Sequence, residues 1–312
     1  MSNRVHIICH PKSGGGKGEN VLHRVRVELD SFQLEHITFK TNYSTHAEIL
    51  TEQLIYKWHR SAFDYLIVIG GDGTLHEVVQ TLIKHQAKIP ITYVPAGTGN
   101  DFSLNWQKGR NIRLIIEKML FSSKPKHIPI IQYTDKLENR SGVIVNNFGK
   151  GVDAEANYQA QKLLKNQLIN KLKVRKLSYL FGLLLSMSRI KHFKVSGQID
   201  NHQFHYNDVS IAAILNSPTL GGGINIDRLT KAHNEEIALV LYHDITFLSM
   251  LDLLFKVLIT KKTNQSKNIS RYTGKTLSLQ ISEEIRGHVD GEVLPEKAVD
   301  LECTLSNYPF YI

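Results

Sequence analysis

Three glycine-rich segments near the start of the chain contain the residue types that bind phosphate. They read HPKSGGGKG (10–18), GGDGT (70–74) and PAGTGND (95–101), and each directly follows an apolar run. Glycine turns and the helix starts behind them expose backbone N–H groups, which suit anions and phosphate above all. One such loop would say little, because turns use glycine in any case, but three at equivalent positions predict a phosphate site.

The loops also contain two carboxylates, Asp72 and Asp101. A carboxylate among amides that attract phosphate is tolerated if it binds Mg²⁺ or a ribose hydroxyl group. Two common phosphate motifs are absent, because Lys17 is followed by Gly18 where GxxxxGK[ST] needs Ser or Thr, and Glu19 replaces the last glycine of GxGxxG. The loops therefore argue against an ordinary P-loop NTPase and against a dehydrogenase.

An alternation of strand and helix patterns over residues 1–125 positions these loops. Helix patterns begin near Gly18, Thr45 and Thr74, and Thr45 with the nearby Glu48 makes a capping-box pattern. Continuous apolar strands separated by helices predict a parallel sheet covered on both faces, with the loops gathered along one edge. The predicted strands span 4–10, 34–40, 65–70 and 91–97.

Strand patterns dominate after residue 125, with hairpin-like alternation at 193–207 and helical insertions at about 153–191 and 246–262. We therefore predict two domains, an α/β domain over 1–125 and an antiparallel β domain over 126–312. The last residues of the second segment are expected to return to the first domain.

The three loops resemble the diacylglycerol kinase catalytic domain, whose family includes bacterial soluble lipid kinases and the sphingosine and ceramide kinases. NAD kinases and phosphofructokinases share the GGDGT element, so that loop alone would not decide. Later blocks continue the resemblance in the expected order, and the final DGE favours the lipid-kinase branch. These blocks are NNFGKGVDAEA (146–156), NSPTLGGG (216–223) and HVDGE (288–292).

The resemblance implies an N-terminal nucleotide domain like that of NAD kinases and phosphofructokinases, a C-terminal β-sandwich and an active site between them. It implies ATP and Mg²⁺ as cofactors, Asp72 in the nucleotide–Mg²⁺ site and Glu292 as catalytic base toward a lipid hydroxyl group. Lys17 is expected to help neutralise the phosphates. The residues expected at ATP are Pro11, Lys12, Ser13, Gly14, Lys17, Thr41, Gly70, Gly71, Gly73, Thr74, Leu75, His76, Glu77, Gly97, Thr98, Asn100 and Asp101.

The sequence departs from the family at two places. His10 stands where the first loop normally begins with Asn. Bacterial members often carry an LDDG loop that binds a structural Mg²⁺ on the second domain, and the matching stretch here reads AHNEEIAL (232–239). Glu235 keeps a carboxylate at the second Asp, and Glu236 replaces the glycine, so Glu235 is the candidate ligand of that metal.

The expected reaction is ATP-dependent phosphorylation of a membrane lipid, with diacylglycerol as the first candidate substrate and phosphatidic acid as product. A regulatory lipid- or nucleotide-binding protein with little turnover is the alternative. A nucleic-acid binder would explain the net charge of +9 but would leave the glycine loops without a purpose, so we expect no nucleic-acid partner.

Residues 162–194 contain nine Lys or Arg and no Asp or Glu. Leucines at helical spacing in this segment are consistent with packing on its own domain and with contact to an anionic membrane surface. Its longest apolar stretch is too short for a membrane span, and Cys9 and Cys303 read as buried reduced thiols. We therefore expect a cytoplasmic protein that contacts membranes peripherally; the oligomeric state stays open, a homodimer included.

Overall fold

The chain forms two compact units in a computed structural model. One unit comprises Met1–Ile128 with Asn307–Ile312, and the other comprises Pro129–Ser306. The last six residues thus belong to the first unit. The structure describes residues 4–58, 64–107, 109, 111–165, 178–186, 190–220, 224–225, 227, 229–231, 234–246, 249 and 267–312.

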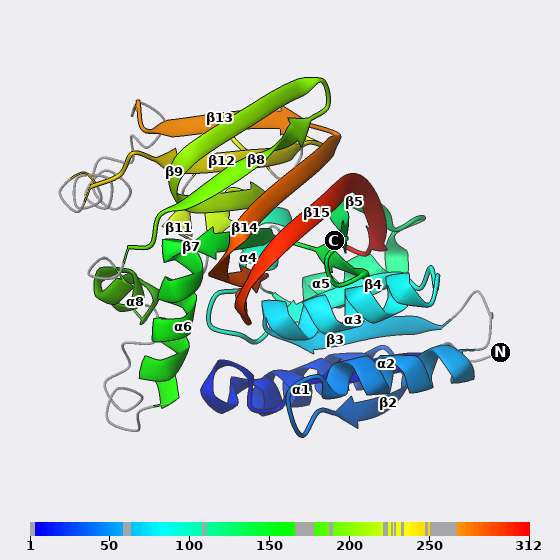
Figure 1. Cartoon of the computed structure of the whole chain (residues 1–312). Helices are drawn as coiled ribbons and strands as arrows, with labels where there is room; N and C mark the ends of the chain where they lie inside the picture. Colours follow the sequence, from blue (N-terminus) through cyan, green and yellow to red (C-terminus); the bar gives the residue numbers. More distant parts are fainter. Residues whose placement is uncertain are drawn as a thin grey trace. The chain divides into compact units, whose positions relative to one another are not determined.

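The first unit alternates strands and helices, as its sequence pattern predicts (Figure 1). Its strands lie in the order β4-β3-β1-β2, and each neighbouring pair runs parallel. The strands are β1 (Arg4–Cys9), β2 (Glu35–Lys40), β3 (Tyr65–Gly70) and β4 (Ile91–Pro95). The helices are α1 (Ser13–Ser31), α2 (His46–Lys57), α3 (Asp72–Lys84), α4 (Asp101–Trp106) and α5 (Ile112–Phe121).

Burial explains why the inner strands are mostly apolar. Five of the six residues of β1 and of β3 are buried, because helices cover both faces of the sheet there. The edge strand β2 is only half-buried and accordingly contains polar residues. The final residues of the chain complete this sheet, since Phe310 at the end of β15 (Glu292–Phe310) pairs parallel with Ile91 of β4.

The second unit is rich in antiparallel strands. Two long strands, β9 and β14, each pair with β8 through one half and with β7 through the other, so these four strands form a closed circuit. The strands are β5 (Lys126–Asp135), β6 (Arg140–Ile144), β7 (Asn147–Gly151), β8 (Phe193–Ile199), β9 (His202–Leu215), β10 (Thr219–Leu220), β11 (Ile224–Asn225), β12 (Ile237–His243), β13 (Ile269–Gly274), β14 (Thr276–Val289) and β15.

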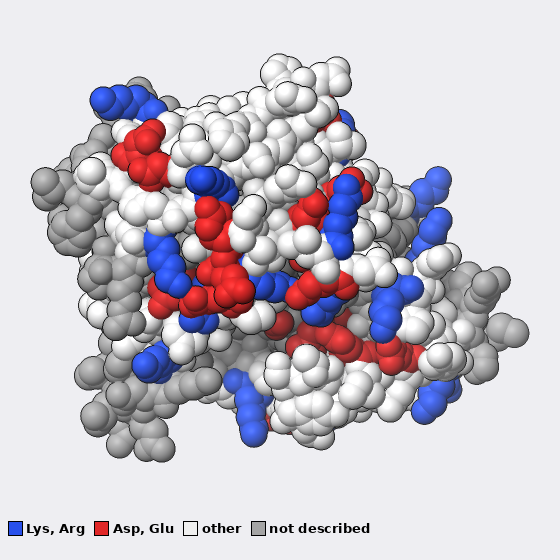
Figure 2. Space-filling view, viewed as in Figure 1, with Lys and Arg blue, Asp and Glu red and all other residues white. Residues whose placement is uncertain are grey.

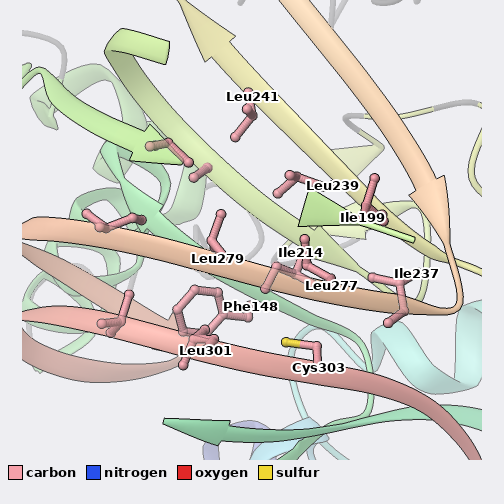
Figure 3. Packing of buried hydrophobic residues seen from close by; sticks show 14 of the residues in the cluster. Phe148, Ile199, Ile214, Ile237, Leu239, Leu241, Leu277, Leu279, Leu301 and Cys303 are labelled. Atoms are coloured by element: carbon pink, nitrogen blue, oxygen red, sulfur yellow. The ribbon is translucent and has the colours of Figure 1, made fainter. Parts of the chain in front are cut away.

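The circuit encloses the main core of this unit. Phe148 of β7, Ile214 of β9 and Leu279 of β14 point toward one another from three of its strands (Figure 3). Leu239 of β12 and Leu301 of β15 extend the same cluster. Inward-facing apolar residues from paired strands thus hold the sheet closed on itself, and burial of this kind contributes about 25 cal/mol per Å² of apolar surface.

Two helices of the predicted insertion at 153–191 are present, α6 (Val152–Lys165) and α8 (Ser178–Ser186). They lie side by side because Gly182 lets their backbones approach: a Cβ at this position would stand 2.3 Å from the carbonyl oxygen of Ala156. The second predicted insertion, at 246–262, lies almost wholly outside the described residues. In the part of the chain that the structure describes, no helix is long and apolar enough to cross a bilayer.

Charges of both signs are interspersed on the face drawn in Figure 2. A chain of ion pairs on the second unit illustrates this mixing. Lys191 lies 2.8 Å from Glu296, and Arg286 bridges Glu296 at 2.9 Å and Glu155 at 2.8 Å. The basic excess of segment 162–194 is therefore partly neutralised, at Lys191, by acidic residues distant in sequence.

Lys150 of β7 is a fully buried lysine that sequence patterns did not single out. Its ammonium group donates hydrogen bonds to the carbonyl oxygens of Ile285, at 2.8 Å, and Lys297, at 2.7 Å. These carbonyls belong to the irregular region where β14 shifts its register against β15. Burial lowers the pKa of Lys150 to about 8, and the nearby charge of Lys297 adds to this effect. The ammonium group of Lys150 thus provides hydrogen-bond donors for two backbone carbonyl oxygens at the place where the pairing of β14 with β15 shifts its register.

Candidate functional site

The three glycine loops lie at the carboxyl ends of neighbouring parallel strands, and backbone hydrogen bonds join them there. The His10 N–H of the first loop donates to the carbonyl oxygen of Ile69 at the end of β3, at 2.8 Å. The Ala96 N–H of the third loop donates to the carbonyl oxygen of Gly70, the last residue of β3, at 2.7 Å. The loop edge predicted from the sequence is therefore a set of hydrogen-bonded neighbours.

Glycines are required where these loops touch. A Cβ on Gly97 would stand 2.5 Å from the Cα of Gly71, and a Cβ on Gly14 would stand 2.2 Å from the carbonyl oxygen of Ala96. Both distances are shorter than Cβ contacts in folded proteins reach, so neither glycine can carry a side chain unless the loops move apart. The result is a surface of main-chain groups drawn from three strand ends, the kind of surface that binds phosphate.

Asp72 ties the second loop to the third. Its Oδ2 accepts the Asp101 N–H at 3.1 Å, and its Oδ1 accepts the Phe102 N–H at 3.0 Å, at the start of α4. Asn100 closes the third loop on itself, because its Oδ1 accepts the Gly97 N–H at 2.8 Å and its Nδ2 donates to the Gly97 carbonyl at 2.9 Å. The two loops are thus held rigidly relative to each other.

The first loop begins α1 with three consecutive glycines at positive φ, from Gly14 to Gly16. Regular helix follows them, as the predicted start near Gly18 requires. Side chains with a Cβ would strain this left-handed turn by about 1–2 kcal/mol per residue. Pro11 is partly exposed and Ser13 is buried, whereas Lys12 and Lys17 are exposed at the loop and available to an anion.

His10 contacts Thr41, one of the residues predicted to contact ATP. The His10 Nδ1 and the Thr41 Oγ1 lie 2.8 Å apart, and the Thr41 N–H donates to the carbonyl oxygen of Cys9. Burial lowers the pKa of His10, and the charge of Lys12 lowers it further, so the ring is neutral at pH 7. The histidine thus fixes Thr41 beside the first loop.

Glu77 is a buried structural acceptor. Its carboxylate accepts the Thr45 N–H at 3.1 Å and the Ala47 N–H at 3.0 Å, at the start of α2. Burial raises the pKa of Glu77, although the two N–H bonds act in the opposite direction. The predicted capping box of Thr45 and Glu48 is wrong, because Thr45 has φ 65° and its side chain makes no cap hydrogen bond. A carboxylate 32 residues away satisfies that helix start instead.

The remaining predicted ATP contacts differ in accessibility. Gly71, Gly73 and Thr74 are partly exposed, and Thr98 is exposed. In contrast, Leu75 packs in the interior with no exposed surface, and its neighbour His76 is buried too. The accessible part of the second loop therefore ends at Thr74, and the residues that follow are buried in the first unit.

Asp72 fits a role in holding Mg²⁺ beside a nucleotide. Its two carboxylate oxygens accept backbone N–H groups of the third loop, and Mg²⁺ is usually held by one or two carboxylates together with substrate phosphates. Among the described residues, no group of three or more His, Cys, Asp or Glu side chains gathers into a complete metal site. An ion at Asp72 would therefore need the oxygens of its nucleotide.

Glu292, the predicted base, lies in the second unit as the first residue of β15. It pairs with Val289 of β14 across a two-residue turn and is partly exposed. The turn residues Asp290 and Gly291 both have positive φ, 50° and 85°. An Asp-Gly pair in this conformation is typical of a type I′ hairpin, so Glu292 stands at a tightly defined chain reversal.

The described residues around Glu235 do not fit a structural Mg²⁺. The exposed Glu235 has its carbonyl oxygen bonded by the Lys275 ammonium group. The neighbouring carboxylates already face a cation: Arg271 Nε lies 2.7 Å from Asp227 Oδ2, and Arg271 Nη2 lies 3.1 Å from Glu236 Oε1. Burial opposes ionisation of Asp227, but hydrogen bonds from Thr230 and Arg271 hold its pKa below the usual value. A guanidinium group thus stands between the available carboxylates.

Comparisons with known proteins identify the two domains of the chain. The diacylglycerol kinase catalytic domain matches residues 4–133, and the YegS C-terminal NAD kinase beta sandwich-like domain matches residues 146–306. "Putative lipid kinase YtlR" of Bacillus subtilis is 29% identical over 299 residues, 92% of each chain. "Putative lipid kinase SERP0390" of Staphylococcus epidermidis is 25% identical, over 78% of this chain and 75% of the relative.

A solved structure extends the similarity of fold to both units. "A putative diacylglycerol kinase from Bacillus anthracis str. Sterne" superposes with a TM-score of 0.73 at 18% sequence identity. The match covers 97% of this chain and 94% of that one. At this identity the likeness describes the fold alone.

The ion cluster around Arg271 predicts a second unit whose folding is independent of Mg²⁺. Arg271→Met would remove the guanidinium group that pairs with the buried Asp227 carboxylate, which should lower the free energy of unfolding by about 3 kcal/mol. Denaturant unfolding of both proteins with EDTA and with Mg²⁺, without nucleotide, measures this. The control is Arg113→Met, whose exposed ion pairs should be worth less than about 1 kcal/mol. Destabilisation of the wild type by EDTA would contradict the prediction.

Proposed function

Because the chain belongs to the diacylglycerol kinase catalytic-domain family, we propose that it transfers the γ-phosphoryl group of ATP to the hydroxyl group of a membrane lipid. Diacylglycerol, which gives phosphatidic acid, is the first candidate substrate. One structural observation carries the proposal: at Gly14 and Gly97 the main chains of the three loops approach so closely that neither position accepts a side chain. A triphosphate is the ligand that such a junction suits.

Phosphoryl transfer requires positioning and charge neutralisation more than covalent work from the protein. The amides of the glycine loops would hold the phosphate oxygens, and the exposed Lys12 and Lys17 would offset their negative charge. Mg²⁺ bound with the nucleotide supplies neutralisation of the β- and γ-phosphates. Asp72 would hold that ion while its hydrogen bonds to Asp101 and Phe102 keep the carboxylate oriented.

Glu292 would act on the acceptor. Its carboxylate would accept a hydrogen bond from the lipid hydroxyl group, align the oxygen with the γ-phosphate and take the proton. A carboxylate is a weak base toward an alcohol, so the proton leaves late and the alignment matters most. Products are the phosphorylated lipid and ADP, and the proton resides on Glu292 until solvent removes it.

A lipid substrate requires contact with a membrane, and α8 has the features for it. Phe181, Leu184 and Leu185 are 47%, 42% and 50% exposed, whereas Gly182 and Ser186 face the protein. The helix therefore offers apolar side chains outward, within a segment, 162–194, that is rich in Lys and Arg. We propose that α8 inserts shallowly at an anionic surface, where each nearby basic residue adds about 1 kcal/mol of attraction.

Labelled ATP incubated with the protein, Mg²⁺ and a total lipid extract tests the proposed reaction. We expect label in the organic phase and, in a screen of purified hydroxyl lipids, the highest incorporation with diacylglycerol. Glu292→Ala should lower turnover by about 10²–10⁴-fold while the dissociation constant for ATP stays unchanged. Glu292→Gln is the matched variant that keeps the shape and removes the base.

The outcomes of this assay separate the alternatives. ATP binding by the wild type with no lipid product would favour a regulatory binding protein of the same fold. Salt-sensitive binding of nucleic acid without ATP binding would favour a nucleic-acid function. Near-native turnover of Glu292→Ala would remove Glu292 from the mechanism.

Vesicle sedimentation tests the membrane proposal. We expect the wild type to bind vesicles that contain anionic lipid several-fold better than neutral ones, and the double variant Phe181→Ser/Leu185→Ser to lose most of this binding. The matched control changes two exposed apolar residues of the first unit, Leu114→Ser and Phe121→Ser, and should bind like the wild type. Equal binding of the wild type to neutral and anionic vesicles would refute the electrostatic part.

A further inference from the structure

The hairpin turn that presents Glu292 is attached to the body of the second unit by its own aspartate. Asp290 accepts the N–H groups of Asn146, at 2.7 Å, and of Val145 and Asn147, both at 3.0 Å. The Asp290 N–H donates to the Asn147 carbonyl oxygen at 2.8 Å. Asp290 thus anchors one half of the turn to the start of β7.

A buried histidine holds the other half. His288 precedes the turn on β14, and its Nδ1 accepts the Gly291 N–H at 3.3 Å. Its Nε2 lies 2.5 Å from Asp153 Oδ2, and both side chains are only 1% exposed. Because Nδ1 accepts, the ring proton belongs on Nε2, where it donates to the Asp153 carboxylate.

The space for this pair is set by a glycine on β7. A Cβ on Gly149 would stand 2.1 Å from Asp153 Oδ2 and 2.4 Å from His288 Nε2. The His288–Asp153 pair therefore occupies the space that a side chain at position 149 would need. It joins the first turn of α6, which carries Asp153, to the hairpin that carries Glu292.

We propose that His288 and Asp153 are positioning residues for the reaction, which rests on the proposed function. Asp153 fixes the tautomer of His288, and His288 fixes the Gly291 N–H, the last backbone donor before Glu292. Asp290 and Gly291 adopt the positive φ of a type I′ turn, and the bond from the Gly291 N–H to His288 helps to fix this turn against β14. Release of this bond misdirects the Glu292 carboxylate, and a displacement of about 1 Å in such a group lowers the rate by about 10²-fold.

Two substitutions of His288 separate its two hydrogen bonds. His288→Asn retains an acceptor near Nδ1 for the Gly291 N–H, whereas His288→Gln retains a donor near Nε2 for Asp153. We expect His288→Gln to lower kcat by about 10²-fold with an unchanged KM for ATP, and His288→Asn to recover at least a tenth of wild-type kcat. Asp153→Asn, which keeps an acceptor for Nε2, should stay closer to wild type than Asp153→Ala.

Hydrogen exchange at the Gly291 amide supplies a readout that does not depend on activity. It should accelerate in His288→Gln and stay slow in His288→Asn. The matched control is His243→Gln, which removes a histidine paired with Asp244 in the same unit and should keep wild-type kcat. If His288→Gln is too unstable to purify, the comparison of Asp153→Asn with Asp153→Ala decides by the same criteria.

The outcomes distinguish this inference from the proposed function. If the wild type phosphorylates lipid but His288→Gln keeps its kcat, or if kcat falls only in proportion to the folded fraction, the positioning role is refuted and the kinase function stands. If the wild type phosphorylates no lipid, the proposed function fails and the inference falls with it. A lowered kcat with restored activity in His288→Asn supports both.

Discussion

The close approach of the main chain at Gly71 and Gly97 is the constraint on which the candidate site depends. It requires that β3 and β4 end at the same level of the parallel sheet and that no side chain enter between their loops. Asp72 then locks the junction, since its two oxygens accept the first two N–H groups of α4. A nucleotide bound there would meet a surface that needs little reorganisation, which lowers the entropic cost of binding.

In the second unit, the carboxylate of Glu292 lies at the end of the long hairpin formed by β14 and β15. The circuit of β7, β8, β9 and β14 closes around an apolar core and gives the hairpin a rigid base. At its tip, Asp290 and His288 bind the turn from both sides.

Much of the fold was predictable because local patterns determine it. Three strands of the first unit, β1, β3 and β4, follow from largely apolar runs, and the loops follow from glycines that only a backbone function explains. The predictions that failed or were missing involve partners far apart in the chain. Thr45 reads as a helix cap, yet Glu77 satisfies that helix start, and Arg271 faces Asp227 from 44 residues away. The buried Lys150 finds its carbonyls 135 and 147 residues later, which no periodicity reveals.

Titration of MgATP into the wild type and into Gly97→Ala, with melting curves to verify folding, tests whether the junction of the glycine loops binds the nucleotide. The added methyl group would stand 2.5 Å from the Cα of Gly71 and would push the two loops apart. We expect the wild type to bind MgATP and the folded variant to bind it at least tenfold more weakly. Equal affinity of the two proteins, or no binding of MgATP by the wild type, would contradict this expectation.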